Sequence, residues 1–167
     1  MNEPIKEKVI YREANEKDYA AVIAMYDKLD EFLREYTFTF PEVNNVGEKW
    51  FETFRRTLGR FSVLYVAEYQ DEIVGFIIAR LKRVPEYLGG VMVGELKDMW
   101  VEHKVRRLGI GEVLLRYAID WCKKQNVYSV EAQILLGNEP ILKLVEYLGM
   151  KRELYQLRMA WDNYNEA

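Results

Sequence analysis

The residues best suited to chemistry form the segment Arg106-Arg107-Leu108-Gly109-Ile110-Gly111, which precedes apolar residues at helical spacing. Glycines let the backbone approach a ligand closely, and the first N–H groups of a helix point outward without partners. The helix dipole favours an anion at that end, and Lys104, Arg106 and Arg107 add formal positive charge. The segment therefore fits a pyrophosphate group.

Two other interpretations of this segment stay open: an ordinary turn with a basic rim, and a nucleotide or nucleic-acid patch at 104–107. The segment is not a dinucleotide fingerprint, because Val113 and Leu114 follow Glu112 where GxGxxG requires its third glycine. No GxxxxGK[ST] phosphate loop occurs either. The net charge of −3 argues against a nucleic-acid partner.

Composition indicates an ordinary globular protein, which we expect to form one domain over residues 1–167. Hydrophobic residues make up 50% of the chain and charged residues 31%. One Cys and one His make a disulfide framework or a metal site improbable. The first residues lack the apolar run of a signal peptide, and no stretch approaches the roughly 20 apolar residues of a membrane span. We therefore expect a cytoplasmic protein that does not bind membranes.

The elements that must position the segment follow from periodicity. Alternating or β-rich runs predict strands over 9–13, 62–69, 72–82, 91–102, 127–135 and 150–161. Helical spacing predicts helices over 19–29, 50–58, 109–125 and 139–148. An antiparallel meander followed by a strand–helix–strand crossover predicts an α/β (α+β) fold, with a mixed, mostly antiparallel twisted sheet flanked by helices on both faces.

The segment MWVEHKVRRLGIG, residues 99–111, resembles the acetyl-CoA-binding signature of the GNAT superfamily of N-acyltransferases. In that signature a strand leads into a basic R/Q-x-x-G-x-G/A loop, and here Arg106, Gly109 and Gly111 take its fixed positions. A second landmark of the family, Asn followed by a Leu-Gly pair, is matched by Asn138 and by Leu148-Gly149. The element order matches as well, so the resemblance covers nearly the whole chain.

The resemblance implies a GNAT fold whose fourth and fifth strands splay apart, here 91–102 and 127–135. It implies that acetyl-CoA binds in this wedge, with CoA as the product, and that an amine attacks the thioester directly without an acyl-enzyme. It assigns the pantetheine arm to backbone groups of the fourth strand, those of Met99 and Val101, and the sulfur end to Asn138. The implied binding residues are Met99, Trp100, Val101, Arg106, Arg107, Leu108, Gly109, Ile110, Gly111 and Asn138.

The implied reaction needs a base, because an amine of pKa near 10.4 is mostly protonated at neutral pH. Glu95 is the first choice, since its place on the fourth strand matches the catalytic glutamate of the histone-acetyltransferase branch. Strand alternation puts it on one face with Met99 and Val101, unless a bulge changes the parity. Asp98 and Glu68 are therefore alternatives.

Four further residues are weighed for catalytic roles. Val145 stands where many family members carry the tyrosine that protonates the leaving thiolate, and it cannot donate a proton. Tyr147 is two residues away, about 200° around a helix, so we expect it to face elsewhere. We expect Cys122 to be a buried structural residue and His103 to be a plain loop residue.

The acceptor site is expected in two connections, 29–46 and 84–90. The first holds Phe32, Tyr36, Phe38 and Phe40 with Asp30, Glu31 and Glu35, which suits an amine but also fits aromatic caps on the core. We expect an acetyl-CoA-dependent N-acetyltransferase acting on a small or protein amine, as a monomer or homodimer. The alternative from a different class is a CoA-binding sensor or partner-binding module without turnover.

Overall fold

The computed structural model describes residues 8–36 and 40–161. Its strands are β1 (Ile10–Glu13), β2 (Ser62–Tyr69), β3 (Glu72–Arg83), β4 (Met92–Val101) and β5 (Ser129–Ala132). The α-helices are α1 (Tyr19–Arg34), α2 (Val46–Glu52), α3 (Ile110–Lys124) and α4 (Glu139–Tyr147). Short 3-10 turns follow at η2 (Arg55–Thr57), η3 (Glu86–Leu88) and η4 (His103–Val105).

The strands form one sheet in the order β1-β2-β3-β4-β5, antiparallel except for the parallel pair β4–β5. Residues Gln70 and Asp71 both have positive φ, +53° and +62°, in the tight turn between β2 and β3. Such a turn matches the right-handed twist of the strands that it joins, as the sequence predicted. The parallel pair is connected through α3, which gives the predicted mixed sheet.

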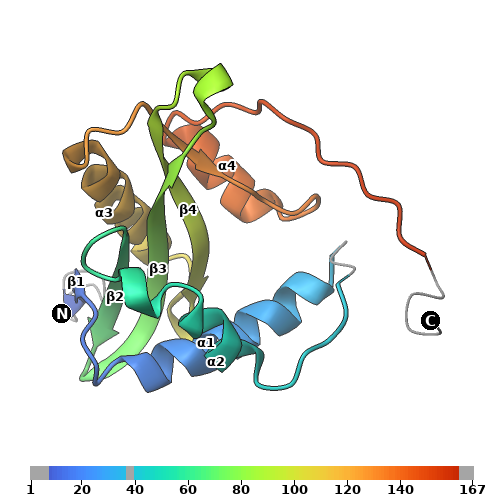
Figure 1. Ribbon diagram of the computed structural model, residues 1–167. Helices are drawn as coiled ribbons and strands as arrows, with labels where there is room; N and C mark the ends of the chain where they lie inside the picture. Colours follow the sequence, from blue (N-terminus) through green and yellow to red (C-terminus); the bar gives the residue numbers. More distant parts are fainter. Residues whose placement is uncertain (1–7, 37–39, 162–167) are drawn as a thin grey trace.

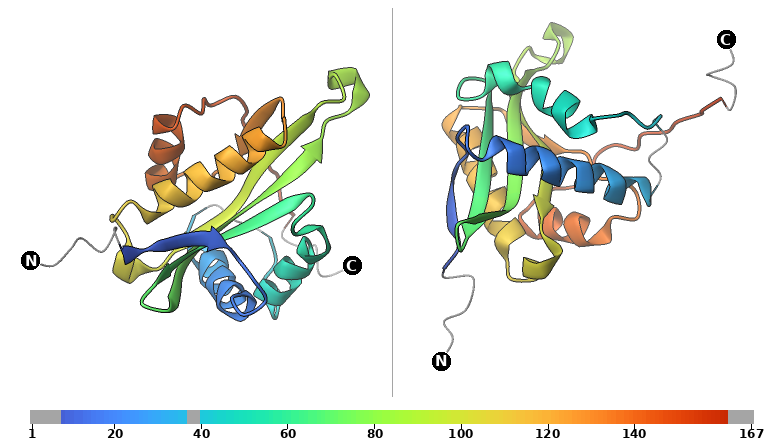
Figure 2. Two further views of the ribbon diagram at one scale, coloured as in Figure 1. Left: turned by 90° about the vertical axis from the view of Figure 1, so that its left-hand side faces the viewer. Right: turned by 90° about the horizontal axis from the view of Figure 1, so that it is seen from below.

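Two helical layers cover the sheet, α1 and α2 on one face and α3 and α4 on the other (Figures 1 and 2). Alternation along β3 divides the core between them. Phe76 and Ile78 pack with α1 and α2, whereas Ile77 and Ala79 pack with α3. Because the sheet is covered on both faces, its central strands are almost continuously apolar. The sequence of β3 shows this, since the residues in the middle of 72–83 are apolar on both faces and buried.

A β-bulge interrupts β4 at its centre. Ala79 of β3 is opposite Leu96, but the preceding Ile78 is opposite Asp98, so Lys97 is an extra residue on β4. A bulge of this kind reverses the alternation of side chains beyond it. The face that Glu95 would share with Met99 in a regular strand is therefore shared with Asp98 instead.

The pairing of β4 with β5 covers only the first half of β4. It runs from Val93 opposite Ser129 to Leu96 opposite Ala132 and then stops. Residues 98–101 are paired with β3 but not with β5, so β4 and β5 are splayed beyond the bulge.

Two predicted elements differ in the structure. The helix expected over 50–58 begins at Val46 and ends at Glu52, and η2 follows it. The strand expected over 150–161 is absent: residues 151–161 have no regular secondary structure and no strand partner. In both segments the spacing of apolar residues favoured the predicted element. Tertiary contacts, however, decide whether such an element forms. Within the described ranges, no helix combines the length and apolar character that crossing a membrane requires.

Candidate active site

The start of α3 has the backbone geometry of an anion site. Arg107 and Gly109 have positive φ, +64° and +79°, and Gly109 is the N-cap of the helix. The first backbone hydrogen bond of the helix runs from the Val113 N–H to the Gly109 carbonyl at 3.2 Å. The N–H groups before Val113 therefore have no carbonyl inside the helix to receive them, and they are directed out of its N-terminus.

The sequence predicted that Lys104, Arg106 and Arg107 add positive charge at the anion site, but two of these side chains have partners within the protein. The Arg106 guanidinium turns back, donating from Nε to the Val101 carbonyl at 2.8 Å and lying 4.5 Å from the Trp100 ring centre. Burial lowers the pKa of Arg106 below its ordinary value. Lys104 forms an ion pair with Glu72 at 2.6 Å. The groups that can face an anion at this loop are therefore the backbone amides and the exposed Arg107. Because Lys104 and Arg106 are already engaged, residues 104–107 do not present the basic patch that a nucleic acid would need.

The splayed half of β4 turns backbone groups toward the wedge. The Glu102 N–H donates to the Val74 carbonyl of β3, so alternation directs the groups of Met99 and Val101 to the opposite side, where β5 is missing. These are the two residues assigned to this edge by the resemblance. The Val101 carbonyl already accepts the bond from Arg106.

Gly111, in the first turn of α3, lies close to side chains of β4 and α4. A Cβ at this position would lie 3.4 Å from Met99 Cε, 3.8 Å from Val101 Cγ2 and 3.9 Å from Leu144 Cδ2. The glycine thus lies close to side chains of both β4 and α4.

Asn138 stands across the wedge, at the N-cap of α4. Its side chain makes no capping hydrogen bond, while its backbone N–H donates to the Leu135 carbonyl at 3.1 Å. The neighbouring Gly137 is so close to Tyr36 that a Cβ would lie 3.2 Å from its ring. The loop after β5 therefore reaches the C-terminal end of α1.

Asp98 is a partly buried carboxylate beside the bulge, on the face of the sheet that carries α2. The indole N–H of Trp50 donates to its Oδ2 at 2.8 Å. Burial raises the pKa of Asp98 above its ordinary value, although the bond from Trp50 and the charges of Lys97 and Arg80 oppose the rise. A small cavity of about 50 Å³ adjoins it, lined by Trp50, Thr53, Phe54, Ile78, Arg80, Lys97 and Asp98.

Glu95 lies on the same face as Asp98, but its carboxylate is already paired. Arg80 Nε donates to one of its oxygens, and Lys97 Nζ lies 3.8 Å from the other. Burial by itself would raise the pKa of Glu95, but the hydrogen bond from Arg80 and the charge of Lys97 leave that pKa below its ordinary value. Glu95 is thus an ionised partner of Arg80, with little tendency to accept a proton.

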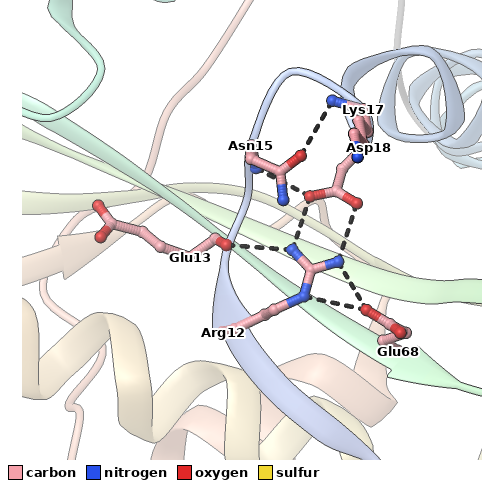
Figure 3. A network of polar contacts seen from close by, with 6 residues as sticks. All are labelled: Arg12, Glu13, Asn15, Lys17, Asp18 and Glu68. Atoms are coloured by element: carbon pink, nitrogen blue, oxygen red, sulfur yellow. Dashed lines mark hydrogen bonds and ion pairs between the residues drawn. The ribbon is translucent and has the colours of Figure 1, made fainter.

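Glu68 is far from these two carboxylates. Figure 3 shows it bound to Arg12, whose guanidinium donates to Glu68 Oε2 at 2.6 Å and to both oxygens of Asp18 at 2.7 and 3.0 Å. Glu68 is opposite Ile73 on β3, whereas Asp98 is opposite Ile78. Five residues along a strand correspond to roughly 16 Å, so Glu68 belongs to a network that ties β1, β2 and α1 together.

The four residues weighed for catalytic roles differ in burial: Val145 and Cys122 are buried, whereas Tyr147 and His103 are exposed. Val145 is buried in the core cluster that includes residues of α3, while Tyr147 is 72% exposed, so α4 turns the tyrosine away as helical geometry predicted. Cys122 is buried, and its burial raises its thiol pKa to about 11, which makes it a structural residue. His103 is exposed and packs edge-on against Trp100, with ring centres 5.5 Å apart.

The aromatic group after α1 is partly a cap on the core. Phe32 packs edge-on against Trp100 and Tyr36, with ring centres 5.8 and 5.4 Å apart. Phe40 is half exposed beneath Arg158, and Asp30 is paired with Arg34. Glu31 and Glu35 are exposed, and Phe38 lies outside the described residues.

Two residues of the site were not singled out from sequence. Trp50 was expected only as an apolar position of a helix, and Arg80 as part of a strand. Their roles arise from pairing across the sheet and between layers, to Asp98 and Glu95, and no local pattern in the sequence marks such contacts.

A family model described as "Acetyltransferase (GNAT) family" matches residues 20–150. The chain belongs to the GNAT acetyltransferase family. It is 32% identical over 114 residues to an N-alpha-acetyltransferase of Sulfurisphaera tokodaii, covering 64% of this chain and 66% of that protein, just under two thirds of its length. It is 27% identical over 146 residues to a phosphinothricin N-acetyltransferase of Streptomyces viridochromogenes, covering 87% and 76%.

A solved structure supports the fold. The predicted acetyltransferase of Clostridium acetobutylicum, crystallised with acetyl-CoA, superposes with a TM-score of 0.71 over 91% of this chain and 96% of that chain, at 17% identity. The mixed sheet, the splayed β4–β5 pair and the helices on both faces are those of the GNAT fold that the sequence predicted.

Proposed function

We propose that this GNAT chain transfers the acetyl group of acetyl-CoA to a primary amine by direct attack in a ternary complex, with Asp98 as the base. The observation that carries the proposal is the partly buried Asp98 carboxylate, with its raised pKa, at the bulge where β4 and β5 part. A carboxylate in this state lies next to the strand edge expected to hold the thioester.

The residues present fit acetyl-CoA, the acetyl donor. The N–H groups at the start of α3 suit its pyrophosphate, since they are directed outward at the positive end of the helix dipole. The unpaired edge of β4 at Met99 suits an amide-rich arm such as pantetheine, which can add to the strand through backbone hydrogen bonds. Gly111 leaves room beside that edge.

Attack requires a neutral amine, and Asp98 supplies the proton acceptor. A carboxyl with a raised pKa takes up a proton from an ammonium more readily than an ordinary one, and holding both reactants side by side supplies much of the rate. As the amine nitrogen bonds to the acetyl carbon, the carbonyl oxygen gains negative charge. A β4 N–H directed into the wedge is placed to stabilise this charge.

The nitrogen then releases its remaining extra proton to water, the carbon–sulfur bond breaks, and the thiolate leaves without help from α4. Val145 is apolar and buried, and Tyr147 points outward. Thiols have pKa values near 8.5, so the thiolate is a tolerable leaving group, and water can protonate it. This arrangement predicts turnover without an enzymic acid.

The acceptor is proposed to be an amine on two grounds. Two relatives of the chain are, by name, an N-alpha-acetyltransferase and a phosphinothricin N-acetyltransferase, and both names describe transfer to nitrogen. The acidic side chains Glu31 and Glu35 at the end of α1 are exposed near Tyr36, which contacts the loop after β5, and they suit a cationic substrate.

The test is calorimetric binding of acetyl-CoA, followed by release of free thiol in the presence of amines. The panel should contain a peptide with a free N-terminus, lysine, phosphinothricin, an aminoglycoside and a polyamine. We expect binding, and thiol release that depends on one class of amine. Absence of binding to both acetyl-CoA and CoA would refute the proposal.

A second candidate is a CoA-binding module without turnover, and the burial of Val145 favours it. It predicts that acetyl-CoA binds but that no amine releases thiol. Val145→Tyr separates the two: if the missing acid limits a real reaction, this change should raise thiol release, provided that the ring fits.

A further inference from the structure

Arg106 is a partly buried cation that forms no ion pair within the part of the chain that the structure describes. The other partly buried arginines of that part, Arg12 and Arg34, are both paired. Arg12 forms an ion pair with Asp18 at 2.7 Å, and Arg34 forms one with Asp30 at 2.8 Å. Burying a charge without a counter-charge costs free energy. The position of Arg106 therefore favours an anion that comes from outside the chain.

Most donor groups of the Arg106 guanidinium are unused among the described residues. Its Nε donates to the Val101 carbonyl at 2.8 Å, and its Nη groups make no hydrogen bond there. Glu102 attracts Arg106 but lies beyond ion-pair distance, and it is paired with Lys28 at 2.6 Å. The planar fork of a guanidinium matches the two oxygens of a carboxylate, and arginine stays charged at any physiological pH.

Aromatic rings and a second donor surround this guanidinium. It lies 4.5 Å from the centre of the Trp100 ring and 5.5 Å from that of the Phe32 ring. The indole N–H of Trp100 is buried and has no hydrogen-bond acceptor among the described residues, although such groups normally have one. Apolar walls exclude water, which strengthens the attraction between a cation and an anion. The surroundings thus combine a permanent positive charge with a second donor and a low dielectric.

The guanidinium lies on the side of the sheet that carries the proposed base. It bonds to the Val101 carbonyl at the open edge of β4, and it covers Trp100, whose ring packs with α1 on the face that also holds Asp98. Asp98 and Trp100 are one repeat apart on this face of β4, roughly 7 Å along the strand. A small acceptor can therefore reach both the base and the guanidinium.

We propose that Arg106 binds a carboxylate of the acceptor, so that the substrates are amines carrying a carboxylate several bonds from the nitrogen. Free amino acids and the N-terminus of an acidic peptide both have this chemistry. The inference rests on the proposed function, because it uses the same base and the same wedge. The amine of the acceptor faces Asp98 while its carboxylate faces Arg106. The exposed Glu31 and Glu35 suit the ammonium form of the amine as it arrives.

The preference of the wild-type chain is the first test. The probes are ω-amino acids of increasing length, from glycine to aminohexanoate, each compared with its own neutral amide. A peptide with glutamate near its N-terminus, compared with the glutamine peptide, tests the second source of the carboxylate. We expect each acid of suitable length to exceed its amide by about ten- to a hundredfold in kcat/KM, as for a charged hydrogen bond. Calorimetry on the CoA-loaded protein measures the same preference without turnover.

Variants of the loop assign the preference to one side chain. Arg106→Met removes the charge and should reduce the acid-to-amide ratio to about one. Arg106→Lys keeps the charge without the planar fork, so it should retain part of the ratio, and it provides the test if circular dichroism shows the methionine variant unfolded. Arg107→Met is the matched control from the same loop. Because Arg107 is exposed beside the anion site, its loss should weaken acetyl-CoA binding and leave the acid-to-amide ratio as in wild type.

Two results would overturn the proposal. One is a wild-type chain that treats every acid and its amide alike in turnover and in binding. The other is an acid preference that both Arg106 variants leave intact. A fall in acetyl-CoA affinity would then assign Arg106 to the pyrophosphate, and a fall in stability alone would make its ring contacts structural. Failure of the proposed function looks different: acids bind better than amides, but no amine releases thiol.

Discussion

Replacing Asp98 with asparagine isolates the proton acceptor from the rest of the site. Asparagine has nearly the same shape, and its Oδ1 can still accept the 2.8 Å hydrogen bond from Trp50. The Arg80–Glu95 pair is not altered. Acetyl-CoA affinity should therefore change little, whereas general-base catalysis, typically about 10²–10⁴-fold, should be lost. This loss corresponds to about 2.7–5.4 kcal/mol in the activation barrier.

The pH dependence gives a second signature. The Asp98 carboxyl must be ionised to act as a base, so wild-type turnover should rise with pH through its raised pKa. Asp98→Asn should lose this rise, and its deficit should shrink as pH approaches the pKa of the amine, where more substrate arrives neutral.

Asp98→Asn should lower turnover, but it should raise the free energy of unfolding relative to wild type at neutral pH. Because the folded-state pKa of Asp98 is raised, its contribution to folding is fully present below the unfolded pKa and is lost as pH rises through the folded value. Asparagine cannot ionise. The variant should therefore gain unfolding free energy relative to wild type as pH rises toward neutrality, measured by denaturant unfolding.

The assay is thiol release with the best amine of the panel, with kcat and KM measured from pH 5 to 10 and acetyl-CoA affinity measured separately. Glu95→Gln is the matched control, a buried carboxylate on the same face of β4, and it should lose less than about tenfold in kcat. The reasoning is refuted if Asp98→Asn keeps wild-type turnover and pH profile while Glu95→Gln collapses. The base would then be Glu95, despite its pairing with Arg80.

Three other changes test separate parts of the structure. Gly111→Val should weaken acetyl-CoA binding at least tenfold by calorimetry because its methyl groups fill the wedge, whereas Gly111→Ala adds a Cβ at ordinary contact distance and should bind with a smaller loss; equal affinity in both would contradict the role of this glycine. Lys97→Met should move the acidic limb of the activity profile to higher pH, since Lys97 lowers the pKa of Asp98, and an unmoved limb would mean that Asp98 does not control it. Arg12→Met should cost about 1–3 kcal/mol in unfolding free energy, because it leaves Asp18 buried without its counter-charge. The pKa of Asp18 is lowered by its hydrogen bonds from Arg12, so its stabilisation is present above the unfolded pKa and lost as pH falls through the folded value. The difference in unfolding free energy between wild type and Arg12→Met should therefore narrow below about pH 4. A difference that persists in acid would mean that Arg12 stabilises the fold by packing instead.

Local sequence determined the elements whose formation depends on near neighbours. The β2–β3 hairpin follows from two alternating runs around Gln70 and Asp71, and α3 follows from its apolar stripe and the glycine at its start. The same locality made the wedge residues recognisable, because the loop from Arg106 to Gly111 is contiguous in the chain. The outward direction of Tyr147 follows from helical periodicity alone.

Tertiary structure decided everything that depends on which strand is opposite which. One extra residue at Lys97 places Glu95 and Asp98 on the same face, and Arg80 then neutralises the first while Trp50 holds the second. The alternation at 155–161 is equally clear in sequence, yet it forms no strand, because a strand exists only when another edge accepts its hydrogen bonds. The sequence of one segment specifies the side chains of a strand but not the edge that it meets, and this edge is a property of the folded chain.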